Sequence, residues 1–333
     1  MLKKKLLIIR LSSIGDIVLT TPVIRCLKQQ TDFEVHYLTK FQYADVLKNN
    51  PYIDELHLLK DDLYKTAIAL KKQKFDIIID LHKNIRTQFL KTIINAKQSY
   101  AFNKINMEKW LAVNLKKINI LPQKHIVDRY FETTKNLSVT NDNEGLDYFI
   151  TDDDYKEALN KINLQTQFMV WAIGAQHYTK RFPVKKIAEV LNNINLPVVL
   201  LGDKHDAQNA PIIIGSTQNK NIINACGKLS INQSAAIVKQ AKFVVSNDTG
   251  LMHIAAAFKK PIISIWGNTI PQFGMYPYYG KHSVQYNIIQ TENLKCRPCS
   301  KIGFKKCPKK HFNCMNKIET SYLENVINIF AQQ

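Results

Sequence analysis

Short runs of apolar residues alternate along most of the chain with longer segments in which apolar residues recur at every third or fourth position. A continuous apolar run is typical of a strand buried on both faces, and Asp76-Ile-Ile-Ile-Asp80 contains such a run. The wider spacing is typical of a helix with one buried face. In the first half this pattern predicts strands at 6–9, 33–38, 53–59, 75–81 and 99–102, and helices at 17–30, 42–48, 63–73 and 86–95.

A polar stretch at 139–145 interrupts the alternation and is interpreted as a linker. The alternation then resumes, and a last helical pattern covers 322–330. The second half is predicted to contain strands at 168–173, 197–201, 221–224, 243–246 and 261–266, and helices at 184–193, 205–214, 232–240 and 251–258.

Repeated alternation of strand and helix predicts parallel sheets with helices on both faces. We therefore expect an α/β fold of two doubly wound, Rossmann-like domains that face each other across a cleft. The expected domains cover 1–145 and 146–318, and a C-terminal helix in 319–333 could pack back on the N-terminal domain. In such sheets ligands bind beyond the carboxyl ends of the strands, so functional residues are expected in the loops there.

The composition, with 45% hydrophobic and 22% charged residues, is that of an ordinary globular protein. No apolar stretch approaches the roughly 20 residues of a membrane-spanning helix, so we expect a cytoplasmic protein that is at most peripheral to the inner membrane. The formal net charge of +19 indicates either an anionic partner or a general bias toward Lys, Ile and Asn. Because the basic residues are scattered and no nucleic-acid motif occurs, a phosphorylated or membrane-surface substrate fits better than nucleic acid.

The first predicted strand runs into a small polar turn, Ser12-Ser13-Ile14-Gly15-Asp16. Asp16 could simply cap the helix that follows. Alternatively, Gly15 leaves room for a ligand to approach the backbone, while Ser13 and Asp16 present a hydroxyl and a carboxylate to it. This turn by itself leaves both interpretations open.

A second polar turn, 246–250, lies between an apolar strand and a helix of small residues. Backbone N–H groups at the start of a helix form an anion site, and Gly250 allows a phosphate to approach them. Asp248 would repel a phosphate and is better suited to binding sugar hydroxyls. Thr249 and His253, the latter one turn into the helix, complete a group that a simple helix cap does not require.

Two further loops follow predicted strands in the second half. Lys180 lies in the loop of 171–183, just before a helix, where a cation could neutralise a leaving phosphate. A solvated basic loop is the alternative. In 202–206, Asp206 could bind a ribose diol or cap the next helix.

These loops together offer a carboxylate from one half of the chain and a diphosphate site, a cation and a hydroxyl-binding aspartate from the other. That combination suits a transferase that moves a sugar from a nucleotide diphosphate to an acceptor hydroxyl. The sequence has neither a dinucleotide-binding glycine motif nor a Walker phosphate loop, which argues against a nicotinamide dehydrogenase and a P-loop NTPase. No cofactor and no catalytic metal are expected.

Five segments resemble those of glycosyltransferase family 9, the ADP-heptose:lipopolysaccharide heptosyltransferases and their relatives. They follow in order along nearly the whole chain and read RLSSIGDIVLTTPVIRCLK, DLHKNIR, GAQHYTKRFP, GDKHD and NDTGLMHIAAAFKKPIISIWG. The resemblance implies a GT-B fold, an inverting reaction and no catalytic metal. It also implies that the N-terminal domain binds the acceptor and the C-terminal domain binds the nucleotide sugar.

Carried over residue by residue, the resemblance makes Asp16 the catalytic base and places Lys180 on the donor phosphates. Asp206 would hold the ribose, and Leu229 stands where a relative lines the nucleotide pocket with Met. The other substrate contacts expected from these motifs are Ser13, Gly15, Gln176, Asp248, Thr249, Gly250 and His253.

The leading interpretation is transfer of heptose from ADP-heptose to an anionic, lipid-anchored lipopolysaccharide-core acceptor at the cytoplasmic face of the inner membrane. One alternative is a transferase of the same family that uses another nucleotide sugar, and a second is a sugar-nucleotide epimerase of GT-B architecture. A non-catalytic, basic nucleic-acid-binding protein is disfavoured, because binding a polyanion requires neither Asp16 nor the Asp248-Thr249-Gly250 turn.

Four of the six cysteines lie near the C-terminus, at Cys296, Cys299, Cys307 and Cys314. The Cys296-Arg-Pro-Cys299 pair is typical of tetrahedral zinc sites, whereas the other two are too widely spaced for a standard zinc ribbon. Bound metal, reduced buried thiols and disulfides all remain open, and no metal is assigned.

Overall fold

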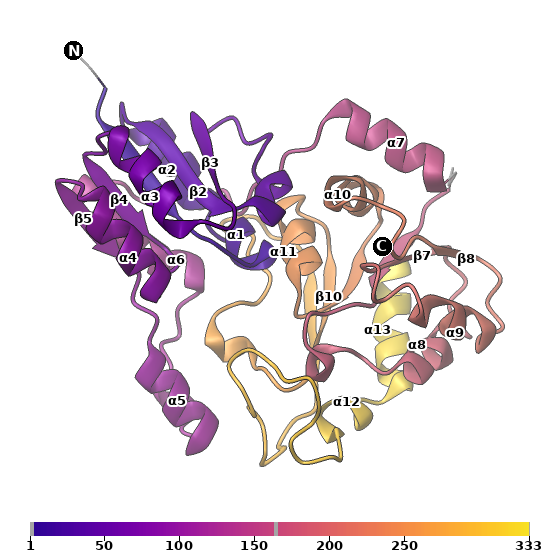
Figure 1. Cartoon of the computed structure of the whole chain (residues 1–333). Coiled ribbons are helices and arrows are strands. Elements are labelled where there is room, and N and C mark those ends of the chain that lie inside the picture. Colours follow the sequence, from indigo (N-terminus) through magenta and orange to yellow (C-terminus); the bar gives the residue numbers. More distant parts are fainter. Residues whose placement is uncertain (1–2, 163–165, 333) are drawn as a thin grey trace. The chain divides into compact units, whose positions relative to one another are not determined.

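The computed structural model describes residues 3–162 and 166–332, which divide into two compact units (Figure 1). The first unit contains the chain up to residue 105 together with 124–149. The second contains 106–123 together with the chain from 150 onward. The division therefore lies a few residues after the boundary expected at 145, and 106–123, expected in the first domain, belongs to the second unit.

The first unit is built on a five-stranded parallel sheet with strand order β3-β2-β1-β4-β5. The strands are β1 (Lys5–Ile9), β2 (Glu34–Lys40), β3 (Glu55–Leu59), β4 (Ile77–Asp80) and β5 (Gln98–Ala101). The helices are α1 (Ile14–Val18), α2 (Thr21–Gln30), α3 (Leu63–Lys72), α4 (Ile85–Ile94) and α6 (Ile126–Phe131), with 3₁₀ turns at Phe41–Val46 and Glu132–Leu137. Residues 6–9 of the central strand β1 are fully buried, as the continuous apolar run predicts.

The second unit is built on a six-stranded parallel sheet with order β11-β10-β9-β6-β7-β8. The strands are β6 (Met169–Ala172), β7 (Val198–Leu201), β8 (Ile222–Asn224), β9 (Val244–Asn247), β10 (Ile262–Trp266) and β11 (Tyr286–Gln290). The helices are α5 (Asn106–Asn114), α7 (Asp152–Ile162), α8 (Val184–Leu191), α9 (Asn209–Gly215), α10 (Ile231–Gln240), α11 (Gly250–Ala257), α12 (Asn313–Asn316) and α13 (Thr320–Gln332), with 3₁₀ turns at Ile118–Ile120, Tyr178–Lys180 and Pro271–Phe273. The predicted class, two doubly wound parallel sheets of the GT-B type, is confirmed.

Every strand predicted from an apolar run is present, with its ends shifted by at most two residues. The strand that the pattern missed is β11, which lies at the edge of its sheet. Only Ile289 of its five residues is buried, so the segment lacks the continuous apolar run of a central strand. The helix predicted at 17–30 is divided into α1 and α2, because Pro22 occupies the first turn of a new helix.

The polar stretch at 139–145 is held against the first unit and is not a free linker. The buried Arg25 of α2 places Nε and Nη2 each 2.8 Å from a carboxylate oxygen of Asp142, and it also pairs with Asp147. Its Nη2 donates a further hydrogen bond to the Gly145 carbonyl at 3.0 Å. The polar residues of this stretch therefore complete a buried ion-pair network instead of spacing two domains.

The C-terminal helix α13, for which the sequence suggested packing on the N-terminal domain, is part of the second unit. It packs on α8, and Leu323, Ile327 and Phe330 belong to the apolar core of the second unit. Phe330 meets Phe243 edge to face, with ring centroids 5.7 Å apart. Within the described part of the chain, no helix has the combination of length and apolarity that crossing a bilayer takes.

Candidate functional site

Both sheets reverse their strand order beside the first strand of the unit. Most of the predicted site residues lie at these two points. In the first unit the chain moves from β1 outward through β2 and β3, and then crosses to β4 on the other side of β1. In the second unit β6 is flanked in the same way by β7 and β9. The loops that leave two such neighbouring strands diverge, which opens space for a ligand at the carboxyl ends.

Asp16 lies in the first turn of α1, directly beyond β1. Its Oδ2 accepts hydrogen bonds from the Ser13 hydroxyl (2.8 Å) and from the Ser13 backbone N–H (3.2 Å). Its Oδ1 lies 2.5 Å from Nη2 of Arg10. Ser13 holds the cap position, so the interpretation of Asp16 as the cap itself is wrong, although Asp16 supports the cap from three residues further on. Both carboxylate oxygens of Asp16 are therefore held by neighbouring groups. The side chain is still 22% exposed and reaches solvent.

Arg10, which sequence reasoning missed, joins the two strand ends at this point. Its Nε donates to the Ser12 carbonyl at 2.8 Å, and its Nη1 donates to the carbonyl of Leu81, the residue after β4, at 2.5 Å. Burial lowers the pKa of Arg10, but Asp16 and other neighbours outweigh it, and the pKa lies above its ordinary value. The sequence contained one indication of this role, because Arg10 directly follows an apolar strand and stands six residues before Asp16.

The last residue of β4, Asp80, is a buried carboxylate. Its Oδ1 accepts from the backbone N–H groups of His82 (3.0 Å) and Lys83 (2.7 Å), and its Oδ2 accepts from the Thr87 hydroxyl (2.8 Å). Burial, followed by the positive charge of Arg10, lowers the pKa of His82 to about 4. His82 is therefore a neutral imidazole at neutral pH within electrostatic reach of Asp16. The sequence segment DLHKNIR contains both residues, but their roles were not assigned from it.

In the second unit, Lys180 and Asp248 meet across the point where the strand order reverses. Lys180 follows β6 and Asp248 follows β9, and Lys180 Nζ lies 2.6 Å from Asp248 Oδ2. The same oxygen accepts a hydrogen bond from the Thr269 hydroxyl at 2.9 Å, from the loop after β10. The expectation that Asp248 would repel a phosphate is thus altered by the structure, because a cation neutralises this carboxylate.

Asn247, another residue that the sequence did not single out, fixes the loops around this pair. It is fully buried at the end of β9. Its side-chain oxygen accepts from the Phe182 N–H at 3.1 Å, and its Nδ2 donates to the carbonyls of Ile173 (3.1 Å) and Gly174 (3.2 Å). Its hydrogen bonds therefore hold both ends of the loop that carries Lys180.

The turn after Asp248 opens helix α11 as predicted. Thr249 is the cap residue and Gly250 is the first helical residue, and both are partly exposed. The Thr249 hydroxyl lies 3.2 Å from the Ser246 hydroxyl. His253 is buried one turn into the helix, at 2% exposure. The backbone N–H groups at the start of this helix therefore lie directly beside the Lys180–Asp248 pair.

Asp206 is only 3% exposed and lies between the ends of β6 and β7. Its Oδ2 accepts from the Asp203 N–H at 3.1 Å, and Arg181 Nη1 lies 3.4 Å from its Oδ1. Burial, with repulsion from Asp203, raises the pKa of Asp206. A Cβ atom at Gly174 or Gly202 would collide with the Asp206 side chain, which explains the glycine at each strand end.

The last two expected substrate contacts lie in the loops that follow two strands of the second unit. Gln176 is exposed in the loop after β6, and Leu229 is half-buried in the turn that follows β8, at the edge of the sheet. The structure therefore brings together Lys180, Asp248, Thr249 and Gly250 in one unit, and Ser13, Gly15 and Asp16 in the other.

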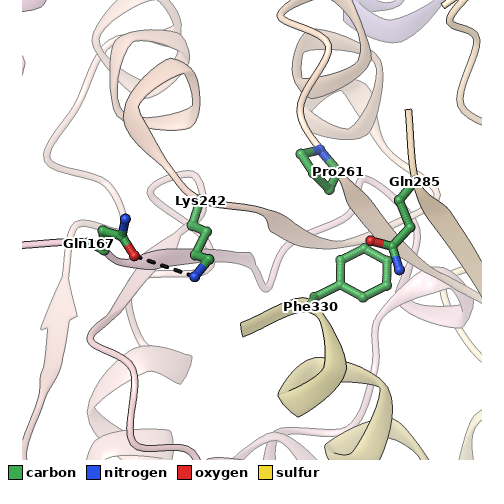
Figure 2. A pocket seen from close by; sticks show the side chains of 5 residues that line it. All are labelled: Gln167, Lys242, Pro261, Gln285 and Phe330. Carbon is green, nitrogen blue, oxygen red and sulfur yellow. Dashed lines mark hydrogen bonds between the residues drawn. The ribbon is translucent and has the colours of Figure 1, made fainter. Parts of the chain in front are cut away.

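A pocket in the second unit lies at the opposite end of the sheet. It has a volume of about 330 Å³ and is lined by residues one or two positions before β6, β9, β10 and β11, together with Phe330 of α13. Figure 2 shows Lys242 and Gln167 at one side of this pocket, with Lys242 Nζ 3.4 Å from the Gln167 side-chain oxygen. Because it lies at the amino ends of the strands, it does not coincide with the predicted ligand site.

All six cysteines lie in the described part of the chain and are free thiols. Cys296 Sγ lies 3.8 Å from His311 Nε2, and Cys299 donates to the Cys296 carbonyl. Burial raises the pKa of Cys299 to about 12 and that of Cys314 to about 11, so both thiols are protonated at neutral pH. Of the alternatives left open by the sequence, the structure contradicts the disulfides.

Comparison with known proteins shows which family this chain resembles. The profile described as glycosyltransferase family 9 (heptosyltransferase) matches residues 63–309. Among characterised relatives, lipopolysaccharide heptosyltransferase 1 of Campylobacter coli is 25% identical over 290 residues, which cover 80% of this chain and 84% of the relative.

Two solved structures share the fold over nearly the whole length. The family 9 glycosyl transferase of Veillonella parvula superposes with a TM-score of 0.79 at 20% identity, covering 100% of this chain and 99% of that one. The Escherichia coli heptosyltransferase WaaC, solved with ADP-2-deoxy-2-fluoro heptose, gives a TM-score of 0.67 at 20% identity and covers 97% of this chain and 99% of its own.

Proposed function

The chain belongs to glycosyltransferase family 9, and from this premise we propose that it transfers heptose from ADP-heptose to the lipopolysaccharide core. The reaction is inverting and needs no catalytic metal. Two relatives that match 80% and 92% of this chain bear the names of a lipopolysaccharide and a lipooligosaccharide heptosyltransferase, and a structural neighbour was solved with a fluorinated ADP-heptose. These names support the donor and the acceptor class.

The observation that carries the proposal is the Lys180–Asp248 pair beside the start of α11. A departing nucleoside diphosphate needs positive charge that is already in place when negative charge builds on it. Lys180 supplies a cation, and the N–H groups at Thr249 and Gly250 supply donors. Asp248 orients Lys180 before the donor binds, and its second role is to bind sugar hydroxyls. Asp206, Leu229, Gln176 and His253 remain predicted contacts of the donor.

Asp16 is proposed as the general base. It removes the proton from the acceptor hydroxyl, the acceptor oxygen forms a bond to the anomeric carbon, and the bond from that carbon to the diphosphate oxygen breaks. ADP leaves with the electron pair, and the configuration at the anomeric carbon inverts. Support comes from the position of Asp16 beyond β1, where Arg10 and Ser13 orient both oxygens and the side chain stays partly exposed. Ser13 and Gly15 are the predicted acceptor-side contacts of the same turn.

A donor screen tests the proposal. The whole chain is heated with ADP-heptose, ADP-glucose, UDP-glucose or GDP-mannose, and the unfolding temperature is recorded. We expect selective stabilisation by ADP-heptose, since a ligand at 100 times its dissociation constant adds about 2.7 kcal/mol. A transfer assay with a heptose-deficient lipopolysaccharide core should then give product without added metal and after treatment with EDTA. Stabilisation by another nucleotide sugar, with transfer of that sugar, would contradict the assigned donor.

A further inference from the structure

Four ionisable side chains lie on one face of the first unit's sheet. The same face carries part of the apolar core, so ionisable residues are not expected there. The four are Glu34 and His36 on β2 and Glu55 and His57 on β3. Residues two apart on a strand share a face, and His36 is the register partner of Glu55, so the four lie side by side. The next positions on the same face, Leu38 and Leu59, belong to the apolar core. The proposed transferase function uses none of these four side chains.

Three of the four side chains lie close enough together to hold one metal ion. One ligand atom from each of His36, Glu55 and His57 lies within 4.8 Å of the other two. His36 Nδ1 is 2.9 Å from His57 Nε2 and 3.4 Å from Glu55 Oε2. Two nitrogens bound to one tetrahedral zinc ion stand about 3.3 Å apart, so the imidazoles need to separate by only a few tenths of an ångström.

The surroundings match those of a metal-binding histidine. The second ring nitrogen of His36, Nε2, lies 2.9 Å from Glu34 Oε1, and a carboxylate in this position fixes the ring orientation of a histidine ligand. Phe75 packs edge-on against both imidazole rings, with centroids 5.0 Å from His36 and 6.1 Å from His57. His36 is fully buried, whereas Glu55 keeps 47% of its side-chain exposure, so an ion can enter past Glu55.

We propose that His36, His57 and Glu55 form a zinc(II) site that ties the edge strand β3 to β2, with Glu34 as the positioning residue of His36. Two imidazoles and one carboxylate are ligands that zinc accepts, and water would occupy the fourth position. The three ligands lie within the sheet, on β2 and on the edge strand β3, whereas Asp16 lies beyond the carboxyl end of β1. The site is therefore structural and separate from the transfer reaction.

The test is direct zinc titration of the whole chain after chelator treatment, with a competing chromophoric chelator to report free metal. We expect binding of zinc that weakens by more than about 100-fold in His57→Gln and in Glu55→Gln, because loss of a ligand costs more than the 10–100-fold of an outer partner. Glu34→Gln should weaken binding by about 10–100-fold. His36→Gln is avoided as the main variant because the side chain is fully buried, and circular dichroism without metal checks that the other variants fold.

The C-terminal cysteines are the competing ligands, and two controls separate them. His282→Gln removes an imidazole from the second unit, and Cys296→Ser removes a thiol, and both variants should bind zinc at this site as the wild type does. With cobalt(II) in place of zinc, the wild type should show ligand-field bands that disappear in His57→Gln. Zinc affinity that is unchanged in His57→Gln and Glu55→Gln but lost in Cys296→Ser would overturn the proposal, and so would the absence of any binding in the wild type.

Discussion

At the scale of single residues, Asp16 and Lys180 carry the chemistry that we propose. Asp16→Asn should keep the fold and the hydrogen bond with Ser13, since the amide has nearly the same shape. The amide cannot take up a proton, so turnover should fall by roughly 10²–10⁴, the usual contribution of a general base. The measurement is steady-state transfer with Asp61→Asn, an exposed aspartate of the same unit, as the matched control. Wild-type turnover in Asp16→Asn would show that Asp16 only supports the start of α1.

Lys180→Ala tests the charge on the leaving group. Loss of a preorganised positive group at a developing anion should lower the catalytic rate by about 10²–10³ and lower ADP affinity less. Lys185→Ala, an exposed lysine at the start of α8, is the control for general positive charge. The loss should persist at high salt, where surface charges are screened. A defect restricted to the Michaelis constant of the acceptor, and absent at high salt, would argue against the role of Lys180 at the diphosphate.

His82 should leave a mark on the pH dependence of stability. Its pKa falls from 6.5 to about 4 in the folded chain, chiefly through burial and then through Arg10. As the pH falls, the unfolded chain therefore protonates this imidazole before the folded chain does. The stability that the folded chain gains from a neutral His82 is complete above pH 6.5 and is lost between pH 6.5 and 4. We expect the unfolding free energy to fall less steeply in that interval for His82→Gln than for the wild type, as measured by urea titration. Identical slopes would contradict a neutral His82.

At the scale of elements, Arg25 anchors the stretch 139–145 to α2. Arg25→Met should destabilise the chain by about 3 kcal/mol, near the lower limit for breaking a buried pair, because Asp142 and Asp147 keep some access to water. Lys28→Met on the same helix is the control, since its pair with Asp54 is exposed and worth about 0–1 kcal/mol. Chemical denaturation monitored by circular dichroism measures both. Equal effects would mean that the stretch behaves as the free linker first expected.

At the scale of the whole molecule, the charge of +19 and an apolar patch on α5 favour contact with an anionic membrane. Met107 and Trp110 of α5, and Leu115 directly after it, are 54–73% exposed, and Lys116 and Lys117 follow them. Each lysine near an anionic surface contributes about 1 kcal/mol at low salt. A larger fraction of the chain should sediment with vesicles that contain phosphatidylglycerol than with neutral vesicles. The Trp110→Ser variant should sediment with the anionic vesicles less than the wild type does. Tyr322→Ser, a comparably exposed aromatic on α13, is the control, and equal binding of the two variants would contradict a role for α5.

The sequence by itself determined the local structure of this protein and the motifs at its strand ends. Apolar runs and helical spacing are local properties, so they located ten of the strands to within two residues, whereas β11, half exposed at an edge, lacks the pattern. The turns around Asp16, Lys180 and Asp248 were found in the same way, because a strand that ends in a glycine-containing polar turn is a local feature.

Only the tertiary structure decided which of these residues meet. Parallel strand pairing brings Leu81 to Arg10 and Asp248 to Lys180, across 71 and 68 positions of the chain, and no periodicity in the sequence encodes strand order. The docking of α13 in the second unit and the His36–Glu55–His57 group depend on the same long-range register. The physical reason is that the hydrophobic pattern specifies which face of an element is buried, while the partner of that face is chosen by packing over the whole fold.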